Sequence, residues 1–392
     1  MHSIKQSFQV PFSYSVIFTK GLFEVDNQAL VDAVSEDGAH RIRKIYFAID
    51  SGVEQLHPQL VKQVKSYVKA YPQIFELCGE PVIVPGGEKA KNDILYVQQV
   101  LEAVNQYGID RHSYLVIIGG GSVLDTIGFA STIAHRGIRH IRVPTTVLAQ
   151  NDAGIGVKNG INQFGKKNFI GCFTPPFAVI NDSNFLTTLD DRDWRSGIAE
   201  AIKVALIKDK DFFYNIQGSA QRLNQRDLSA MQQLIYRCAE MHLNHIASGD
   251  PFEMGSSRPL DFGHWAAHKL EHLSSYTIRH GEAVAMGIAL DVTYSLLKGM
   301  ITKTEHEEIL NLFKSLGFKL YVPEMSLHLD HPDNSNNILG GLEEFREHLG
   351  GDLTVMLLEG IGTGVEVNEM DQTTILEALE ILQRFDAPDK QA

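Results

Sequence analysis

Residues 114–118 (YLVII) form a short, wholly hydrophobic run that leads directly into three consecutive glycines. An apolar run of this length, bounded by turn residues, is typical of a strand that is buried on both faces of a sheet. The sequence predicts further strands at 44–49, 81–84, 140–143 and 177–180, and helices at 59–70, 93–106 and from residue 123 onward. Because strands that alternate with helices form parallel sheets, the first half is predicted to be a Rossmann-like α/β domain.

The second half shows a different pattern. Long segments with the apolar spacing of helices dominate it, at 228–248, 262–273, 282–298, 304–315 and 373–385. We therefore expect two domains, an α/β domain over residues 1–185 and a mostly helical domain over residues 186–392.

The composition of the chain disfavours several kinds of function. The chain has a formal net charge of −13, which disfavours nucleic acids and anionic membranes as partners. It contains no apolar run of about 20 residues, the length that spans a bilayer. Its first residues lack the features of a signal peptide, and its three cysteines are widely spaced. These features predict a cytoplasmic protein with reduced thiols.

The glycine-rich turns lie where predicted strands end. Gly119-Gly120-Gly121-Ser122 follows one strand and opens a helix, Pro85-Gly86-Gly87-Glu88 follows another, and Asp50 ends a third. Ligands of open α/β sheets bind at the carboxyl ends of the strands, where glycines let the backbone approach a phosphate. The pattern favours a dinucleotide, although each feature could also be an ordinary turn, and the GxGxxG fingerprint is absent.

Cationic residues cluster between positions 135 and 170, where Asp152 is the only carboxylate. In so acidic a chain this cluster favours a bound phosphate, with a solvated basic face as the alternative. The six cationic residues are Arg136, Arg139, Arg142, Lys158, Lys166 and Lys167.

A carboxylate and several histidines in the second half could bind a metal ion. His264 and His268 are four residues apart on a predicted helix and so share one face. His272 continues the row, His280 precedes another helix, and Glu200 could supply a carboxylate from a different helix. A catalytic zinc takes about three protein ligands, but a single histidine is more often structural, and the residues alone do not choose among these.

These segments together resemble the sugar phosphate cyclase superfamily, of which 3-dehydroquinate synthase is a member. The match covers about residues 50–358, is strongest over 119–173, and includes the segments AEAIKVALI, DFGH and RHGEA. Within the superfamily the chain looks closest to the EboD-like or 2-epi-5-epi-valiolone synthase-like branch. The resemblance implies a homodimer, a heptulose phosphate substrate, NAD, and Zn²⁺ or Co²⁺ held by Glu200, His264 and His280.

The resemblance also implies roles for further residues. Those expected to contact NAD are Asp50, Glu88, Lys91, Gly119, Gly120, Gly121, Ser122, Asp125, Thr145, Thr146 and Lys167. Those expected to bind the substrate phosphate are Arg136, Lys158, Asn168 and His268. Those expected at the reacting groups are Asp152, Lys158, Lys203, Arg258, Asp261 and His268.

The family reaction is a carbon–oxygen lyase reaction. A secondary hydroxyl is transiently oxidised by NAD⁺, phosphate leaves by β-elimination, the hydride returns, and an intramolecular aldol reaction closes the carbocycle. This resemblance implies the same sequence of steps for the present chain.

Two segments depart from the 3-dehydroquinate synthase pattern. In that enzyme a Lys and an Arg meet the substrate carboxylate, whereas residues 241–255 here contain neither, and Arg258 is one residue closer to the metal histidine. Asp261 replaces an Asn, and Arg346 or His348 stands in for paired lysines. We therefore expect sedoheptulose 7-phosphate as substrate and a valiolone-type cyclitol as product. The alternatives are 3-dehydroquinate synthesis from 3-deoxy-arabino-heptulosonate 7-phosphate, an NAD-dependent metal alcohol or glycerol dehydrogenase, and an inactive scaffold.

Overall fold

The protein is described here from a computed structural model. The structure describes residues 3–35, 38, 41–164, 166–252, 260–330, 334, 336–349 and 352–387, without the side chains of 348 and 349. The chain divides into two compact units: unit 1 contains residues 1–145 and 154–185, and unit 2 contains residues 146–153 and 186–392. Residues 146–153, which we assigned to the N-terminal domain from the sequence, therefore belong to unit 2.

Unit 1 is built on a parallel sheet with the strand order β1-β9-β6-β5-β2-β3, in which β4 also pairs with β2. Its strands are β1 (Ser15–Thr19), β2 (Arg43–Asp50), β3 (Phe75–Leu77), β4 (Val82–Val84), β5 (Tyr114–Gly119), β6 (Arg139–Pro144) and β9 (Ala178–Asp182). A separate antiparallel hairpin consists of β7 (Lys158–Gln163) and β8 (Lys166–Phe173).

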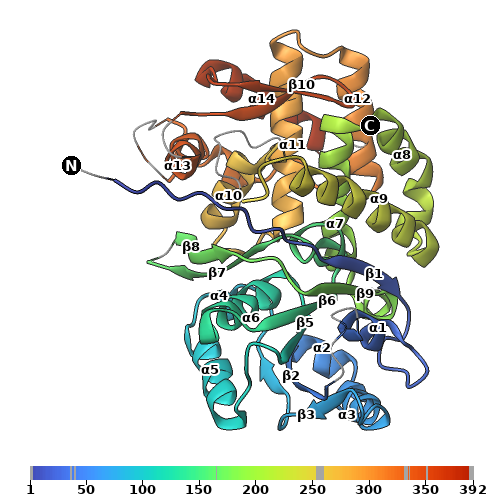
Figure 1. The fold of residues 1–392 in the computed structure, drawn as a ribbon. Helices are drawn as coiled ribbons and strands as arrows, with labels where there is room; N and C mark the ends of the chain where they lie inside the picture. Colours follow the sequence, from blue (N-terminus) through green and yellow to red (C-terminus); the bar gives the residue numbers. More distant parts are fainter. Residues whose placement is uncertain are drawn as a thin grey trace. The chain divides into compact units, whose positions relative to one another are not determined.

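Helices cover both faces of this sheet (Figure 1). They are α1 (Ala29–Ser35), α2 (Ser51–Leu56), α3 (Leu60–Ala70), α4 (Glu88–Lys91), α5 (Leu95–Tyr107) and α6 (Gly121–Ile133). Every residue of β5 is buried, because its side chains point alternately into the two helical layers. The predicted Rossmann-like domain is thus confirmed.

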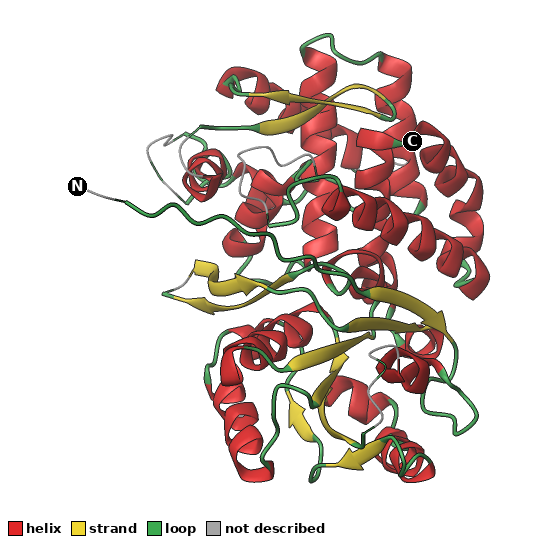
Figure 2. Ribbon diagram, in the orientation of Figure 1, coloured by secondary structure: helices red, strands yellow, loops and turns green. Residues whose placement is uncertain are grey.

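Unit 2 is mostly helical, as Figure 2 shows by colour. Its helices are α7 (Asp191–Lys208), α8 (Lys210–Asn224), α9 (Leu228–Ala247), α10 (His264–Leu273), α11 (His280–Leu297), α12 (Lys303–Ser315), α13 (Gly340–Leu349) and α14 (Gln372–Asp386). Unit 2 also contains a two-stranded sheet, β10 (Val355–Gly360) with β11 (Thr363–Val367), a π-helical turn, η2 (Ala149–Ala153), and a short 3-10 helix, η4 (Pro323–Ser326).

Helix α11 is the centre of unit 2. It packs against α7, α10, α12 and α14, and all its residues from Ala283 to Ser295 are buried. A helix that is apolar on all sides is stable only when other elements surround it. The side chains that α11 and its neighbours direct toward one another therefore have defined positions, including those of the site described below.

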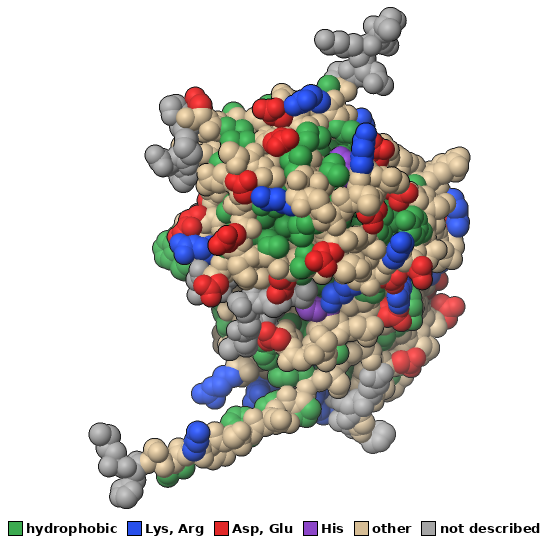
Figure 3. All heavy atoms as spheres, turned by 90° about the horizontal axis from the view of Figure 1, so that it is seen from above, with side chains coloured by type: hydrophobic (Ala, Val, Ile, Leu, Met, Phe, Trp, Pro, Cys, Tyr) green, Lys and Arg blue, Asp and Glu red, His purple; other side chains and the backbone are tan. Residues whose placement is uncertain are grey.

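The surface carries mixed charge. On the face in Figure 3, acidic and basic side chains are interspersed among apolar ones. Within the described residues, none of the helices combines the length and the apolarity needed to cross a bilayer.

Candidate active site

The strand ends of unit 1 form a crowded, glycine-lined corner around Asp50. This residue ends β2, and its carboxylate accepts a hydrogen bond of 2.8 Å from the backbone N–H of Gly52, which caps α2. Burial raises the pKa of Asp50 above its ordinary value and outweighs the backbone N–H groups that lower it. A Cβ atom at Gly86 would lie 2.7 Å from the Asp50 carboxylate, and one at Gly119 would lie 2.9 Å from Val123 Cβ. These two positions accept only glycine without rearrangement.

Helix α6 begins at this corner without a capping side chain. Its first residues are Gly121 and Ser122, and Gly120 precedes it in extended conformation. The first N–H groups of such a helix have no partner within the helix and favour an anion. Nearby, the backbone N–H of Thr145 donates to Gly119 O over 3.1 Å, and the buried Thr145 Oγ1 has no hydrogen-bond partner among the described residues. A ligand hydroxyl or phosphate would satisfy both groups.

A second polar cluster in unit 1 surrounds Lys91. The buried Lys91 ammonium donates to Asp125 Oδ2 at 2.6 Å and to Asn168 Oδ1 at 2.7 Å. Glu88 lies beside it, 3.6 Å from Lys167 Nζ. The structure thus groups four residues expected at NAD with Asn168, which we expected at the phosphate, while Thr146 belongs to unit 2.

Two of the six cations between residues 135 and 170 have structural roles. Arg142 is fully buried and donates to the carbonyls of Gly154, Gly156 and Lys158. Arg139 packs against the ring of Phe177. The charge cluster therefore contains fewer cations for a ligand than its composition indicated, because a buried guanidinium was needed to satisfy loop carbonyls.

Arg136 and Lys158, by contrast, are exposed in unit 1. Their proposed contact with the substrate phosphate stays a prediction.

In unit 2, helix α7 carries Glu200 and Lys203 at its buried centre. The helix begins after Asp190, whose side chain accepts a hydrogen bond from the N–H of Asp193. A Cβ atom at Gly281 of α11 would lie 2.2 Å from Ser196 O of α7. Only glycine allows α11 to approach α7 this closely, and the approach brings the first residue of α11, His280, toward Glu200.

Glu200, His264 and His280 converge from α7, α10 and α11. His280 Nε2 lies 3.3 Å and His264 Nε2 lies 3.6 Å from Glu200 Oε1, and one ligand atom from each residue lies within 4.8 Å of the others. Burial, and then the charge of Lys203, lower the pKa of His264 to about 3. Burial also disfavours the charged form of His280, but Glu271 and Glu200 outweigh it and raise the pKa to about 10.

These three residues fit a divalent metal ion. One carboxylate and two imidazoles are the donor set of many catalytic zinc sites, which keep a further position open. Glu200 is fully buried, yet neither of its carboxylate oxygens accepts a well-formed hydrogen bond from a described residue. Lys203 lies beside Oε2 and compensates its charge, whereas Oε1 faces the two imidazoles, where a bound cation would compensate it.

A chain of charged groups extends from Glu200. Lys203 Nζ lies 2.5 Å from Glu200 Oε2 and 3.8 Å from Asp152 Oδ2, and His242 Nδ1 lies 3.1 Å from Asp152 Oδ1. Burial lowers the pKa of Lys203, but Glu200 and Asp152 outweigh it, so the net shift is upward. Burial, and then the charge of Glu200, raise the pKa of Asp152. Lys203 therefore remains charged between two carboxylates.

The remaining expected residues of unit 2 have varied positions. His268 is exposed, and its ring is 5.4 Å from that of His264 and 6.0 Å from that of His280. Asp261 is partly buried, and its backbone carbonyl accepts the N–H of His264. Arg346 pairs with Glu343 of its own helix. Arg258 and the side chain of His348 lie outside the described residues.

Sequence reasoning missed three residues that support the site. His242 was overlooked because only lysine and arginine were sought in its segment. Glu271, 3.2 Å from His280 Nδ1, shares a helical face with His264, a spacing that could have revealed it. Asp291 is fully buried and accepts hydrogen bonds from Gly263 N–H and Trp265 Nε1, on either side of His264. Asp291 was missed because it lies 27 positions from His264 in the sequence, on another helix.

Comparison with known proteins shows the family of this chain. Residues 81–196 match the model of the 3-dehydroquinate synthase N-terminal family, and residues 197–332 match that of the 3-dehydroquinate synthase C-terminal family. The 3-dehydroquinate synthase of Coxiella burnetii is 33% identical over 314 residues, covering 80% of this chain and 84% of that protein. The one of Nitrosospira multiformis is 35% identical over 301 residues, covering 76% and 79%.

Two solved structures of cyclases also match this chain. The 2-epi-5-epi-valiolone synthase of Streptomyces hygroscopicus, solved with NAD⁺ and Zn²⁺ bound, superposes with a TM-score of 0.85 at 29% identity. The match covers 98% of this chain and 100% of that one. A 2-deoxy-scyllo-inosose synthase shares the fold, with a TM-score of 0.71 at 21% identity over 94% and 96% of the two chains. The chain belongs to the 3-dehydroquinate synthase family and is an enzyme of the sugar phosphate cyclase type, a carbon–oxygen lyase.

Proposed function

We propose that this enzyme converts sedoheptulose 7-phosphate to a valiolone-type C7 cyclitol and inorganic phosphate, using NAD and Zn²⁺ or Co²⁺. The similarity to 2-epi-5-epi-valiolone synthase over nearly the whole of both chains supports this substrate class and these cofactors. We also propose a cytoplasmic homodimer, for which the family resemblance is the reason.

The observation that carries the substrate proposal is the composition of the last part of α9. This helix packs against η2, which bears Asp152, and the residue that it places beside Asp152 is His242. Residues 241–252 contain no lysine or arginine. A site for a substrate carboxylate ordinarily provides a permanent cation, since burying an unpaired carboxylate is costly. A substrate without a carboxylate fits this helix better.

NAD would supply a reversible hydride acceptor, and the divalent ion would supply a Lewis acid that polarises the reacting oxygen. Glu200, His264 and His280 would hold the ion. Lys203 would remain protonated and keep Asp152 and Glu200 ionised. Asp152, in contact with His242, would orient the hydroxyls of the sugar.

The other roles stay as the family resemblance implies them. In unit 1 the glycine-lined corner at Asp50 and the start of α6 would hold NAD, with Thr145 Oγ1 as a donor to it. The expected phosphate contacts of Arg136, Lys158, Asn168 and His268 rest on that resemblance alone.

3-Dehydroquinate synthesis is the second candidate. It is favoured by the Coxiella and Nitrosospira relatives, which are named 3-dehydroquinate synthase and are 33% and 35% identical. The two candidates share the fold, the cofactors and the reaction type, and differ in whether the substrate carries a carboxylate.

Phosphate release distinguishes them. Purified protein with NAD⁺ and Zn²⁺ or Co²⁺ is given sedoheptulose 7-phosphate or 3-deoxy-arabino-heptulosonate 7-phosphate at equal concentration. We expect release from the first at least about 100-fold faster, since an unpaired buried carboxylate costs several kcal/mol. Release from the second alone would disprove the substrate proposal while leaving the cyclase assignment intact. NMR of the product would then give its stereochemistry.

A further inference from the structure

Glu271 is a buried carboxylate outside the three proposed metal ligands. It is 4% exposed and lies on α10, seven residues after His264. Seven residues are about two helical turns, so Glu271 and His264 lie on the same face of α10. That face is turned toward α11, against which α10 packs.

The ring of His280 lies between two carboxylates. Its Nε2 is 3.3 Å from Glu200 Oε1, and its Nδ1 is 3.2 Å from Glu271 Oε2. An imidazole that donates an N–H from one nitrogen offers a lone pair at the other. Once an ion replaces the proton at Nε2, Glu271 as acceptor would keep the remaining proton at Nδ1, with the Nε2 lone pair toward Glu200 and His264.

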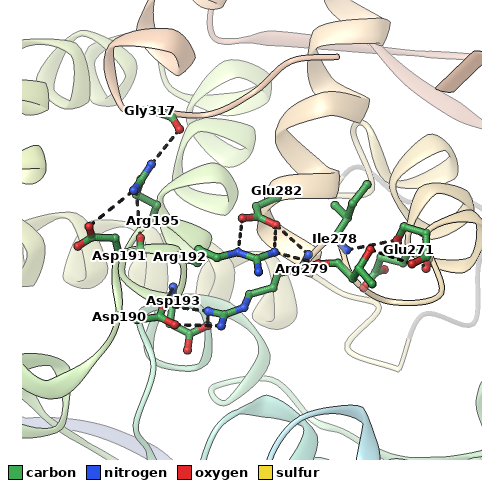
Figure 4. A network of polar contacts seen from close by, with 12 residues as sticks. Asp190, Asp191, Arg192, Asp193, Arg195, Glu271, Ile278, Arg279, Glu282 and Gly317 are labelled. Atoms are coloured by element: carbon green, nitrogen blue, oxygen red, sulfur yellow. Dashed lines mark hydrogen bonds and ion pairs between the residues drawn. The ribbon is translucent and has the colours of Figure 1, made fainter. Parts of the chain in front are cut away.

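The helix that carries His280 is fixed independently of Glu271. Arg279 donates to both carboxylate oxygens of Asp190 at 2.9 Å. Arg192 of α7 makes a similar paired contact with Glu282 of α11, at 2.7 and 2.6 Å. Figure 4 shows these α7 residues on one side of Arg279 and Glu282, with Glu271 on the other. These ion pairs place the start of α11, but they leave the rotation of the His280 ring to its own contacts.

We propose that Glu271 is a positioning residue for the metal site, which selects the Nδ1–H tautomer of His280 and aims Nε2 at the ion. The inference rests on the proposed metal ligands and extends them. Metal-bound histidines commonly donate their second N–H to a carboxylate, and loss of that partner typically weakens metal binding by about 10–100-fold. One helix, α10, would then supply both a ligand and the group that orients another ligand.

A second ion offers a competing explanation for this carboxylate. His268, Glu271 and His280 also have ligand atoms within 4.8 Å of one another. An ion held there through Nδ1, together with one at Nε2, would require His280 to lose both ring protons. Neutral imidazole carries one N–H, so this arrangement demands a far stronger base than the single-ion arrangement does.

The test is metal affinity of the full-length protein. Zn²⁺ dissociation constants are measured by competition with a chelating dye, and metal content is measured by mass spectrometry. We expect one Zn²⁺ per chain in the wild type. The Kd should rise about 10-fold in Glu271→Gln, which keeps an acceptor oxygen without the charge, and up to about 100-fold in Glu271→Leu. The absorption bands of bound Co²⁺ should shift in both variants.

Two controls separate this role from a structural one. Glu344→Gln removes a carboxylate that pairs with Lys269 of α10, and it should leave the Kd unchanged. The melting temperature of each metal-free variant shows whether the fold is kept, and Glu271→Gln serves if Glu271→Leu unfolds. An unchanged Kd in a folded Glu271→Gln and Glu271→Leu would overturn the inference, as would two ions per wild-type chain. A wild type that binds no metal would instead refute the proposed metal site.

Discussion

The two units build their sites by different means. In unit 1 the glycine-lined corner is made of backbone: strands end side by side, glycines admit a ligand, and α6 begins without a capping side chain. In unit 2 the site is made of side chains that meet from η2, α7, α9, α10 and α11. The first kind of site tolerates changes of side chain but not of glycine. The second depends on each charged partner, because Glu200 and Lys203 are buried and the loss of either would leave the other without its counter-charge.

The largest effect should follow from breaking the side-chain site at Glu200. Glu200→Ala removes the carboxylate ligand of the proposed metal set. Loss of a residue that only orients a ligand weakens metal binding by up to about 100-fold, so loss of the ligand itself should weaken Zn²⁺ binding by more. Phosphate release and Zn²⁺ content should both fall, while NAD binding measured by fluorescence should be kept. If Glu200→Ala retains Zn²⁺ and activity, the metal site lies elsewhere.

The next largest effect should come from a substitution at Gly281 of unit 2. Gly281→Ala places a methyl group 2.2 Å from Ser196 O, a backbone atom that cannot move aside cheaply. Such overpacking typically costs about 1–3 kcal/mol. We expect a lower free energy of unfolding in urea and weaker Zn²⁺ binding. Gly218→Ala is the control, because its added Cβ meets no described atom within 4 Å outside the backbone of α8. It should leave Zn²⁺ binding unchanged and raise the free energy of unfolding by up to about 1 kcal/mol, since alanine favours a helix interior over glycine.

The matching change in unit 1 should affect the other ligand. Gly119→Ala brings a Cβ within 2.9 Å of Val123 Cβ and 3.1 Å of Asp50 Cβ. If strain of about 1.4 kcal/mol falls on the bound state, the Kd for NAD rises about tenfold. Isothermal titration would measure it, with Zn²⁺ affinity expected to stay constant. Loss of Zn²⁺ affinity without loss of NAD affinity would contradict the assignment of NAD to unit 1 and of the metal ion to unit 2.

A further effect concerns Asp291 and the dependence of stability on pH. Burial raises the pKa of this carboxyl to about 7, against the hydrogen bonds from Trp265 and Gly263 that lower it. Because the folded protein holds this proton where the unfolded chain has released it, the stabilisation is present at low pH. It is lost as pH rises from about 4 through 7, by at most about 1.4 kcal/mol per unit.

Asp291→Asn should remove that slope. The comparison is the free energy of unfolding in urea at pH 5, 6 and 7 for the variant and the wild type. At pH 5 the variant should also be less stable than the wild type, because its amide N–H₂ would face one of the two donors, Gly263 N–H or Trp265 Nε1–H. Parallel slopes in the two proteins would show that Asp291 is ionised throughout this range.

The fold was readable from the sequence where periodicity was strong. Residues 228–248 and 304–315 were predicted as helices and form α9 and α12. Helix α7 was expected only as a helix around Glu200, without bounds, because its first half is polar and its buried second half includes Glu200 and Lys203, which interrupt the apolar pattern. The β7–β8 hairpin was missed for a similar reason: its strands are polar and pair only with each other.

The two sites also differ in how far the sequence alone predicts them. Glycines at strand ends mark the corner of unit 1 directly in the sequence. The choice of His280 over His272 could not be made from spacing, because it depends on how α11 packs against α7. In the structure His272 is exposed, whereas His280 faces Glu200. The catalytic and binding roles of these residues stay predictions until the measurements above are made.

Residues 146–153 leave unit 1, contribute Asp152 to the charged cluster of unit 2, and return. This excursion limits how such a protein can be recombined. A chimera joined at residue 186 would inherit Lys203 and His242 from one parent and Asp152 from the other. Parents that differ at position 152 or 242 would yield mismatched charge partners in an otherwise intact helical unit. Exchange of substrate specificity between relatives would therefore need two segments of the gene to be transferred together.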